Sequence, residues 1–253
     1  MVANKHFDLA VKSPGRINLI GEHIDYNGGH VLPAAINLNI TIRFKKKEGN
    51  VCHVSSKEKN GFKFNIHQTL KPKSNNHWAN YVLGVINGIL NLRPQQLSAF
   101  DCEIESDLPI GSGISSSAAL ECGITFGLNA LFNLNLSKLE QIKIAQKAEH
   151  DFVGIKCGIM DQFAVTMGQE KKVILLNCET LKYELFDANI DPYKIVLLNT
   201  NVEHKLASSE YNNRRKECEK AMEIIKSKYT NYHHLAEVSI DVIKTLENEL
   251  DEL

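Results

Sequence analysis

A stretch of small residues runs directly into a long apolar segment at DLPIGSGISSSAALECGITFGLNALF, residues 107–132. Pro109, Gly111 and Gly113 favour a turn, and the alanines and leucines that follow favour a buried helix that begins near Ser115. Glycine and serine leave the backbone open to close approach, while a helix N-terminus offers partial positive charge to a phosphate group. Hydroxyls for phosphate oxygens or a magnesium ion come from three consecutive serines, Ser115, Ser116 and Ser117.

This loop matches neither of two common nucleotide-binding patterns, since G-x-x-x-x-G-K-[ST] and G-x-G-x-x-G do not occur in the chain. Many helices begin with serines on a glycine turn without binding a ligand. On these residues alone, a phosphate loop and a well-capped helix are therefore both open.

Hydrophobic periodicity predicts both strands and helices along the rest of the chain. Within residues 31–47, apolar side chains at every second position indicate a half-buried strand. Across 77–92 the apolar residues recur at helical spacing. Ser137 and Glu140 form a capping box that begins another helix, which ends near His150. Further elements are predicted as strands at 100–105, 173–176 and 195–198 and a charged helix from about Ser208.

The mixture of helices with strands that look antiparallel in places indicates an α+β fold. A net charge of −1 and a pI near 6.8 give no general attraction to nucleic acid or to a membrane surface. No signal peptide or membrane-spanning stretch is recognisable, so the chain is expected in the cytoplasm. Six cysteines without a C-x-x-C pair suggest core thiols rather than disulfides or a zinc site. The expected partner is a small molecule or another protein, and the oligomeric state does not follow from these residues.

A second short stretch is rich in hydrogen-bonding side chains. In SPGRINLIGEHIDYNGG, residues 13–29, Arg16, Glu22, His23 and Asp25 lie within ten residues. We predict that they share a short turn between glycines. So many polar groups are unusual for a segment that only connects two elements.

Three segments in order resemble the motifs of one enzyme family. GRINLIGEHIDYNGGHVLP at residues 15–33 resembles the signature of galactokinases, and LPIGSGISSSAAL at 108–120 resembles the phosphate loop of the GHMP superfamily to which they belong. CGIMDQFA at 157–164 is similar to the galactokinase segment that carries the catalytic aspartate. The resemblance extends from about Val11 to Glu219, and its three long motifs are highly specific.

The resemblance implies the two-domain α+β fold of GHMP kinases, in which nucleotide and sugar bind in the cleft between the domains. The N-terminal domain would comprise residues 1–187, and residues 188–253 would begin the second domain. The implied reaction transfers the γ-phosphoryl group of MgATP to the C1 hydroxyl of α-D-galactose, giving α-D-galactose 1-phosphate. Galactose, ATP and Mg²⁺ are thus the expected ligands.

Several residues match sugar-contacting positions of the family, namely Glu22, His23, Asp25, Gly158 and Tyr211. A site that separates sugar epimers must hydrogen-bond each hydroxyl in turn, because a buried unpaired group costs about 1–3 kcal/mol. Gly158 would let backbone come close to the sugar, and Tyr211 would supply a hydroxyl and an apolar ring face. Without the resemblance, Tyr211 reads as an exposed tyrosine on a helix.

Asp161 matches the catalytic aspartate of the family, and Arg16 matches the arginine paired with it. An ionised carboxylate beside the C1 hydroxyl can accept its proton, while the arginine holds that carboxylate and offsets charge on the phosphoryl group. A neighbouring cation also makes an aspartate a weaker base. Full proton removal and mere orientation of the hydroxyl therefore both stay open, and on the residues alone the two side chains could form a structural ion pair.

The nucleotide side of the implied site contains the glycine-serine loop and a metal. Ser117 and Glu149 match the magnesium ligands, which suits a cation that prefers oxygen. Glu149 by itself reads as a surface glutamate on a helix. Trp78 resembles a residue near the adenine pocket, although it also lies on the apolar stripe of its helix. The loop residues implied to contact ATP are Gly111, Ser112, Gly113, Ser115, Ser116 and Ser117.

The chain departs from the family after Arg215. The superfamily has a third, glycine-rich motif close to the nucleotide, but no glycine follows Gly168 here. The second domain is therefore expected to be incomplete, with half of the cleft wall missing and apolar surface exposed where it would pack. We expect this chain alone to be weakly active or inactive.

Other functions stay open beside a galactose kinase. A GHMP kinase for another sugar, such as N-acetylgalactosamine or arabinose, is one alternative, although the intact G-E-H-x-D-Y set favours galactose. A module that binds sugar and nucleotide without phosphoryl transfer is a second, and the intact SSSAA and Asp161 weigh against it. A structural remnant that binds neither ligand is the third.

Overall fold

The computed structural model describes residues 6–74, 77–109, 112–198 and 207–250. Within them a five-stranded sheet has the spatial order β1-β3-β6-β4-β5. Neighbouring strands are antiparallel, except that β4 runs parallel to β6. Its strands are β1 (Leu9–Asn18), β3 (Pro33–Lys46), β4 (Val51–Ser56), β5 (Phe62–Asn65) and β6 (Phe100–Ser106).

Alternating apolar and polar residues give β3 one face that packs into the core and one polar face. Ile40, Ile42 and Phe44 are buried, whereas Arg43 points to the other face and forms an ion pair with Glu105 of β6. Side chains of successive strand residues point to opposite faces, so one face of β3 becomes apolar and the other polar. The predicted strand at 31–47 is confirmed, as are the strand at 100–105 and the helix at 77–92.

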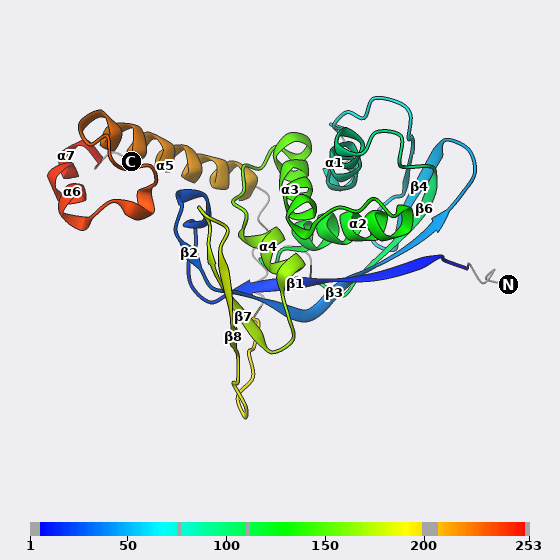
Figure 1. The fold of residues 1–253 in the computed structure, drawn as a ribbon, viewed down its shortest axis with the longest axis horizontal. Helices are drawn as coiled ribbons and strands as arrows, with labels where there is room; N and C mark the ends of the chain where they lie inside the picture. The colour runs from blue at the N-terminus through cyan, green and yellow to red at the C-terminus, as the bar shows by residue number, and fades with distance from the viewer. Residues whose placement is uncertain (1–5, 75–76, 110–111, 199–206, 251–253) are drawn as a thin grey trace.

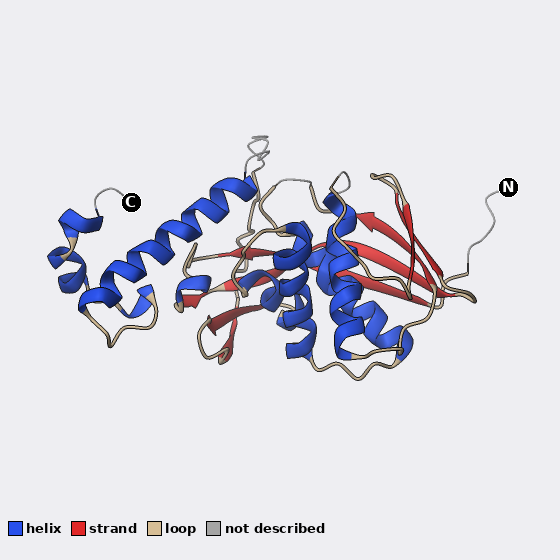
Figure 2. Cartoon of the chain, turned by 90° about the horizontal axis from the view of Figure 1, so that it is seen from above, coloured by secondary structure: helices blue, strands red, loops and turns tan. Residues whose placement is uncertain are grey.

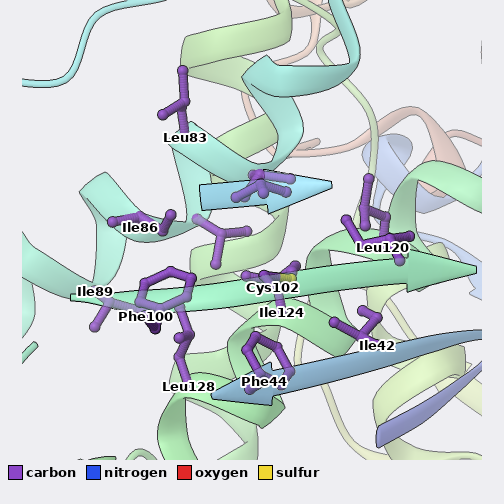
Figure 3. Packing of buried hydrophobic residues seen from close by; sticks show 14 of the residues in the cluster. Ile42, Phe44, Leu83, Ile86, Ile89, Phe100, Cys102, Leu120, Ile124 and Leu128 are labelled. Carbon is purple, nitrogen blue, oxygen red and sulfur yellow. The ribbon is translucent and has the colours of Figure 1, made fainter. Parts of the chain in front are cut away.

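Three helices cover one face of the sheet (Figures 1 and 2). They are α1 (His77–Leu92), α2 (Ser116–Phe132) and α3 (Lys138–Ala148). Figure 3 shows side chains of β3 and β6, among them Ile42, Phe44 and Phe100, packed against those of the helices. At Gly127 the backbone of α2 comes so close to β3 that an added Cβ would overlap the ring of Phe44. This contact fixes α2 on the sheet.

A smaller sheet lies beside the first, with the order β2-β7-β8. Its strands are β2 (His30–Val31), β7 (Lys172–Asn177) and β8 (Tyr183–Asp187), and the helix α4 (Met160–Met167) packs on it. Buried Ile174 and Leu176 alternate along β7, which confirms the strand predicted at 173–176. The mixed antiparallel and helical arrangement is the predicted α+β class.

The C-terminal part of the described chain is helical and extends away from the sheets (Figure 1). It consists of α5 (Ala207–Lys228), α6 (Ile240–Thr245) and α7 (Glu247–Leu250), and α5 confirms the charged helix predicted from Ser208. In the described part of the chain, no helix combines the length and the apolar character needed to cross a membrane. The six cysteines are free thiols; Cys52, Cys102 and Cys122 are buried and the other three are half-buried.

Two predictions of secondary structure are wrong. Residues 195–198 were expected as a strand but lie outside any sheet, and Val196 and Leu198 are 72% and 86% exposed. A strand needs a partner for its backbone groups, and none pairs with this segment among the described residues. The predicted turn at 13–29 is also wrong in its first part, because residues 13–18 belong to β1.

The capping box at the start of α3 is present as predicted. The Ser137 hydroxyl accepts from the Glu140 N–H, and the Glu140 carboxylate accepts from the Ser137 N–H. Replacing Ser137 with alanine is expected to lower the free energy of unfolding by about 1 kcal/mol, because the first helical turn loses a hydrogen-bond acceptor. Urea unfolding measures this, with the exposed Ser98→Ala as the control. Equal stability of the two variants would contradict the assignment.

Candidate active site

The three motifs meet where β1, the glycine-serine loop and α4 converge. Arg16 of β1 binds both carboxylate oxygens of Asp161 in the first turn of α4, with Nε–Oδ1 and Nη2–Oδ2 distances of 2.7 Å. The third guanidinium nitrogen, Nη1, donates to the Gly113 carbonyl at 2.7 Å. The Ser115 hydroxyl donates to Oδ2 of Asp161. A bidentate pair of this kind fixes both position and orientation.

This arrangement leaves Asp161 able to act on a ligand. A carboxylate has about four lone-pair directions, and Arg16 and Ser115 occupy three of them. The side chain is 26% exposed, whereas that of Arg16 is 13% exposed. Asp161 can therefore accept one more hydrogen bond, or a proton, on its open side while Arg16 binds it on the other side. The predicted ion pair is present. It is compatible with a purely structural role and with a catalytic role for Asp161.

The glycine-serine loop does not have the geometry of a well-capped helix. Ser115 is the N-cap of α2, yet its side chain makes no capping hydrogen bond, because it binds Asp161 instead. Its φ of 58° lies in the left-handed region, which is costly for a residue with a Cβ and is typical of functional sites. Among the described residues, no atom beyond the chain neighbours of Gly113 lies within 4 Å of the place a Cβ would take there. Ser112 is bonded to the Pro109 carbonyl, and Gly111 lies outside the described residues.

Glu149 is buried, so its interpretation as a surface glutamate is wrong. It is only 6% exposed, because α3 ends at Ala148 and the chain continues as a π-helical turn, Glu149–Val153. Burial and the nearby charge of Asp161 raise the pKa of Glu149 to about 7, against hydrogen bonds from Ser117, Cys157 and Gln162 that lower it. Within the described residues it forms no ion pair.

Ser117 and Glu149 fit a magnesium ion by their chemistry. One hydroxyl and one carboxylate face each other as hydrogen-bond partners, and hard oxygen donors of this type are the ligands that magnesium takes beside phosphate oxygens and water. A buried carboxylate without a cation is also a costly arrangement that a bound metal would relieve.

The polar loop after β1 holds the predicted sugar residues. The exposed Glu22 accepts from Asn18 at 2.9 Å, and Nδ1 of His23 lies 2.6 Å from the Tyr26 hydroxyl. His23 has a φ of 58°, and Asp25 begins a short 3-10 turn, Asp25–Asn27. The loop thus presents several polar groups to one side.

Tyr211 joins this loop from α5, so its interpretation as an exposed helix tyrosine is wrong. Its ring lies 5.4 Å from that of His23 and 5.7 Å from that of Tyr26, centroid to centroid. The Gly158 N–H donates to its hydroxyl at 3.4 Å. A residue from the C-terminal segment is thereby part of the candidate sugar site.

Gly158 lies directly against Asp25. A Cβ added at Gly158 would overlap the Asp25 carboxylate, so only glycine lets the two segments meet. Burial and then the charge of Asp161 raise the pKa of Asp25 to about 6, although backbone N–H groups of Met160 and Tyr26 bind the carboxylate and lower it. The Asp25 and Asp161 carboxylates thus belong to one electrostatic site.

Some contributors were not predicted, and one prediction has no support in the geometry. Tyr26 lies between His23 and Tyr211, and the Arg215 guanidinium stacks on its ring at 5.3 Å. The polar motif GEHIDYNGG contained the signal for Tyr26. Trp78 packs edge-on against Phe62 at 5.1 Å, against the main core, as its position on the apolar stripe of α1 predicts. Its contact with adenine stays a prediction.

The raised pKa of Asp25 makes stability depend on pH. Its value in the unfolded chain is near 3.8 and in the folded chain about 6, so the folded state holds the proton more tightly between these values. The free energy of unfolding should therefore fall as the pH rises from about 4 to 6, by about 2–3 kcal/mol from this group, and stay low above. Asp25→Asn is expected to remove this part of the slope in urea unfolding.

The matched control for this measurement is Asn27→Ala. It removes a hydrogen bond to the His23 carbonyl in the same loop but leaves the carboxyl in place. Its slope with pH should remain that of the unsubstituted chain. An Asp25→Asn slope equal to that of the control would contradict the assignment.

Comparison with known proteins finds the same resemblance as the sequence motifs. The family description "GHMP kinases N terminal domain" matches residues 80–169, and "Galactokinase galactose-binding signature" matches residues 3–46. A galactokinase of Clostridium tetani is 45% identical over 237 residues, which is 92% of this chain. The chain is similar to galactokinases over most of its own length. One of Thermotoga maritima is 41% identical over 87% of the chain.

The chain also resembles a solved structure. The crystal structure of Lactococcus lactis galactokinase complexed with galactose superimposes with a TM-score of 0.86 and 35% identity, and the match covers 95% of this chain. The chain spans 59% and 61% of the length of the two relatives named above, and 62% of the Lactococcus chain. The GHMP fold with an incomplete second domain, as predicted, is consistent with this coverage. The boundary at residue 187 stays a prediction.

Proposed function

We propose that this chain carries the acceptor and phosphoryl-transfer chemistry of a galactokinase, moving the γ-phosphoryl group of MgATP to the C1 hydroxyl of α-D-galactose. The observation that carries the proposal is the Arg16–Asp161–Ser115 junction. It joins a polar loop suited to a sugar with a glycine-serine loop suited to phosphates, at a carboxylate that can accept a proton. The match to the galactose-binding signature and the likeness to a galactokinase solved with galactose support it.

Asp161 is the group proposed to act on the C1 hydroxyl. Its open side can accept the hydroxyl proton as the oxygen attacks phosphorus. Arg16 holds the carboxylate and offsets negative charge that the phosphoryl group brings into the site. Asp161 either removes the proton during the transfer or only orients the hydroxyl, and the same contact would serve both roles.

The sugar would be held by the loop after β1 and by Tyr211. Glu22, His23 and Asp25 present acceptors and a donor, and the tyrosine ring offers an apolar face. A sugar hydroxyl of the wrong configuration would leave one of these groups unpaired, which costs about 1–3 kcal/mol if it is buried. Discrimination between epimers follows from this cost.

ATP would place its phosphates at the N-terminus of α2. Backbone N–H groups near Ser115 lack a side-chain cap from that residue, and the helix end is positively polarised. Ser117 and Glu149 would hold the magnesium ion, which when bound neutralises charge on the phosphate oxygens.

The test is ADP release with MgATP and a panel of sugars. Galactose-dependent release that exceeds release with N-acetylgalactosamine or arabinose would support the proposal. Greater ADP release with another sugar would identify that sugar, and not galactose, as the substrate. Calorimetry with galactose alone separates the remaining cases, since binding without turnover would indicate a sugar-binding module and binding of neither ligand a structural remnant.

A further inference from the structure

We propose that Gln162 and Glu121 form a buried amide–acid pair that positions Glu149, and that Glu121 serves in this pair as a neutral carboxylic acid. Both are therefore positioning residues, which do not touch the substrate. The inference rests on the proposed function in so far as Glu149 is the magnesium ligand. The pairing itself follows from the contacts of the described residues.

The contacts converge on the carboxamide of Gln162. Its Nε2 donates to Oε2 of Glu149 at 3.0 Å and to Oε2 of Glu121 at 3.3 Å. Gln162 and Glu121 are both fully buried, with 0% exposure. The two N–H bonds of one amide thus reach two carboxyl groups, one from α2 and one from the π-helical turn after α3.

Two polar atoms of this cluster have no partner. Oε1 of Glu121 and Oε1 of Gln162 are buried and unsatisfied. Two oxygens cannot pair unless one carries a proton. A proton on Oε1 of Glu121 converts it into a donor, and Gln162 Oε1 is then the acceptor that it lacks. In the proposed pair one proton satisfies both atoms, and with the Nε2–Oε2 contact it closes a ring of two hydrogen bonds between the acid and the amide.

The surroundings also disfavour a charge on Glu121. No lysine or arginine forms an ion pair with it in the described part of the chain, and a buried unpaired carboxylate is costly. Burial, and then the nearby charge of Glu149, raise the pKa of Glu121 well above its usual range. With Glu121 neutral, only the Glu149 carboxyl remains to carry a charge in this cluster.

This pair gives Gln162 a defined task. Asp161 and Gln162 are adjacent in α4, so Arg16 holds one side chain while the Glu121–Gln162 ring holds the other. With one amide N–H bound in the ring, the second is held on Oε2 of Glu149. The orientation of the Glu149 carboxylate then depends on Gln162, which is fully buried. Partners of metal ligands typically change metal affinity by about 10–100-fold when they are removed.

The first experiment tests the protonation state without any ligand. Infrared spectra of the unsubstituted chain and of Glu121→Gln are compared at neutral pH. The difference between the two spectra should contain the carbonyl-stretch band of one protonated carboxylic acid, present in the unsubstituted chain and missing from the variant. Identical spectra in this region would overturn the amide–acid pair.

The second experiment measures binding of Mn²⁺, as a probe for magnesium, in the presence of ADP by electron paramagnetic resonance. Gln162→Leu should weaken Mn²⁺ binding by about 10–100-fold. Glu121→Gln can donate and accept as the neutral acid does, so it should stay within about threefold of the unsubstituted chain, whereas Glu121→Leu should resemble Gln162→Leu. Equal losses in Glu121→Gln and Glu121→Leu would mean that a charge is needed and would overturn the proposal.

Gln141→Leu is the matched control for a merely structural effect. Gln141 is also a buried glutamine, bonded to the Leu136 carbonyl at 3.0 Å, but it has no contact with Glu149. Thermal unfolding identifies variants that remain folded, and this control should lose stability without losing Mn²⁺ affinity. An unsubstituted chain that binds no Mn²⁺ with ADP would overturn the metal role and the positioning role together, while the infrared band still decides the pair.

Discussion

Replacing Asp161 with alanine is expected to lower any galactose-dependent ADP release by this chain by about 10²–10⁴-fold, the range that a positioned proton acceptor contributes. The carboxylate accepts three hydrogen bonds from Arg16 and Ser115 and is still open on one side. Without it, the C1 hydroxyl has no acceptor, and the guanidinium of Arg16 is left without its counter-ion. Steady-state kinetics with MgATP and galactose measure the loss.

The split between kcat and KM decides how this result is understood. Loss in kcat with little change in the KM for galactose would place Asp161 in the chemical step. Asp151→Ala is the control, since Asp151 is an exposed carboxylate on the neighbouring turn, bonded only to Lys147 among the described residues. Full activity in Asp161→Ala, or an equal loss in the control, would contradict the assigned role.

Replacing Gly158 with alanine is expected to raise the KM for galactose, or its dissociation constant in calorimetry, by about 100-fold. The new Cβ would overlap the Asp25 carboxylate, so the loop after β1 must shift away from α4. Overpacking of this kind typically costs about 1–3 kcal/mol of stability, and a displacement of about 1 Å in a site can reduce activity by about 10²-fold. Asp25 and Tyr211 both lie on Gly158, so the shift would reach both.

Two glycine controls separate the site from general damage. Gly127→Ala would overlap Phe44 in the main core, so it should lower stability without a specific loss of galactose affinity. Gly49 has a positive φ of 86° but, among the described residues beyond its chain neighbours, no atom within 4 Å of an added Cβ, so Gly49→Ala reports backbone strain alone. Galactose affinity that is unchanged in Gly158→Ala, or reduced as much in Gly127→Ala, would contradict the proposed contact.

The sequence predicted the elements that have a regular spacing of apolar residues or a local capping motif. The alternation in β3, the helical stripe of α1 and the capping box of α3 depend on neighbours within a few residues, so they were confirmed. Residues 195–198 have the apolar composition of a strand, but a strand also requires a partner, and the described chain offers none. β1 was missed for a related reason, because its pairing with β3 lies far along the chain.

The sequence by itself also indicated the resemblance to galactokinases and predicted most candidate site residues, because the motifs around Arg16, Ser115 and Asp161 are contiguous and specific. Only the tertiary structure decided what surrounds each of them. It buried Glu149 and brought Tyr211 from α5 onto His23, and it revealed the pair of Glu121 and Gln162 beneath Glu149. Burial and charge are properties of the surrounding fold rather than of neighbours in sequence. A motif contains the same carboxylate whether water or a folded interior surrounds it, so the sequence alone does not tell the two surroundings apart.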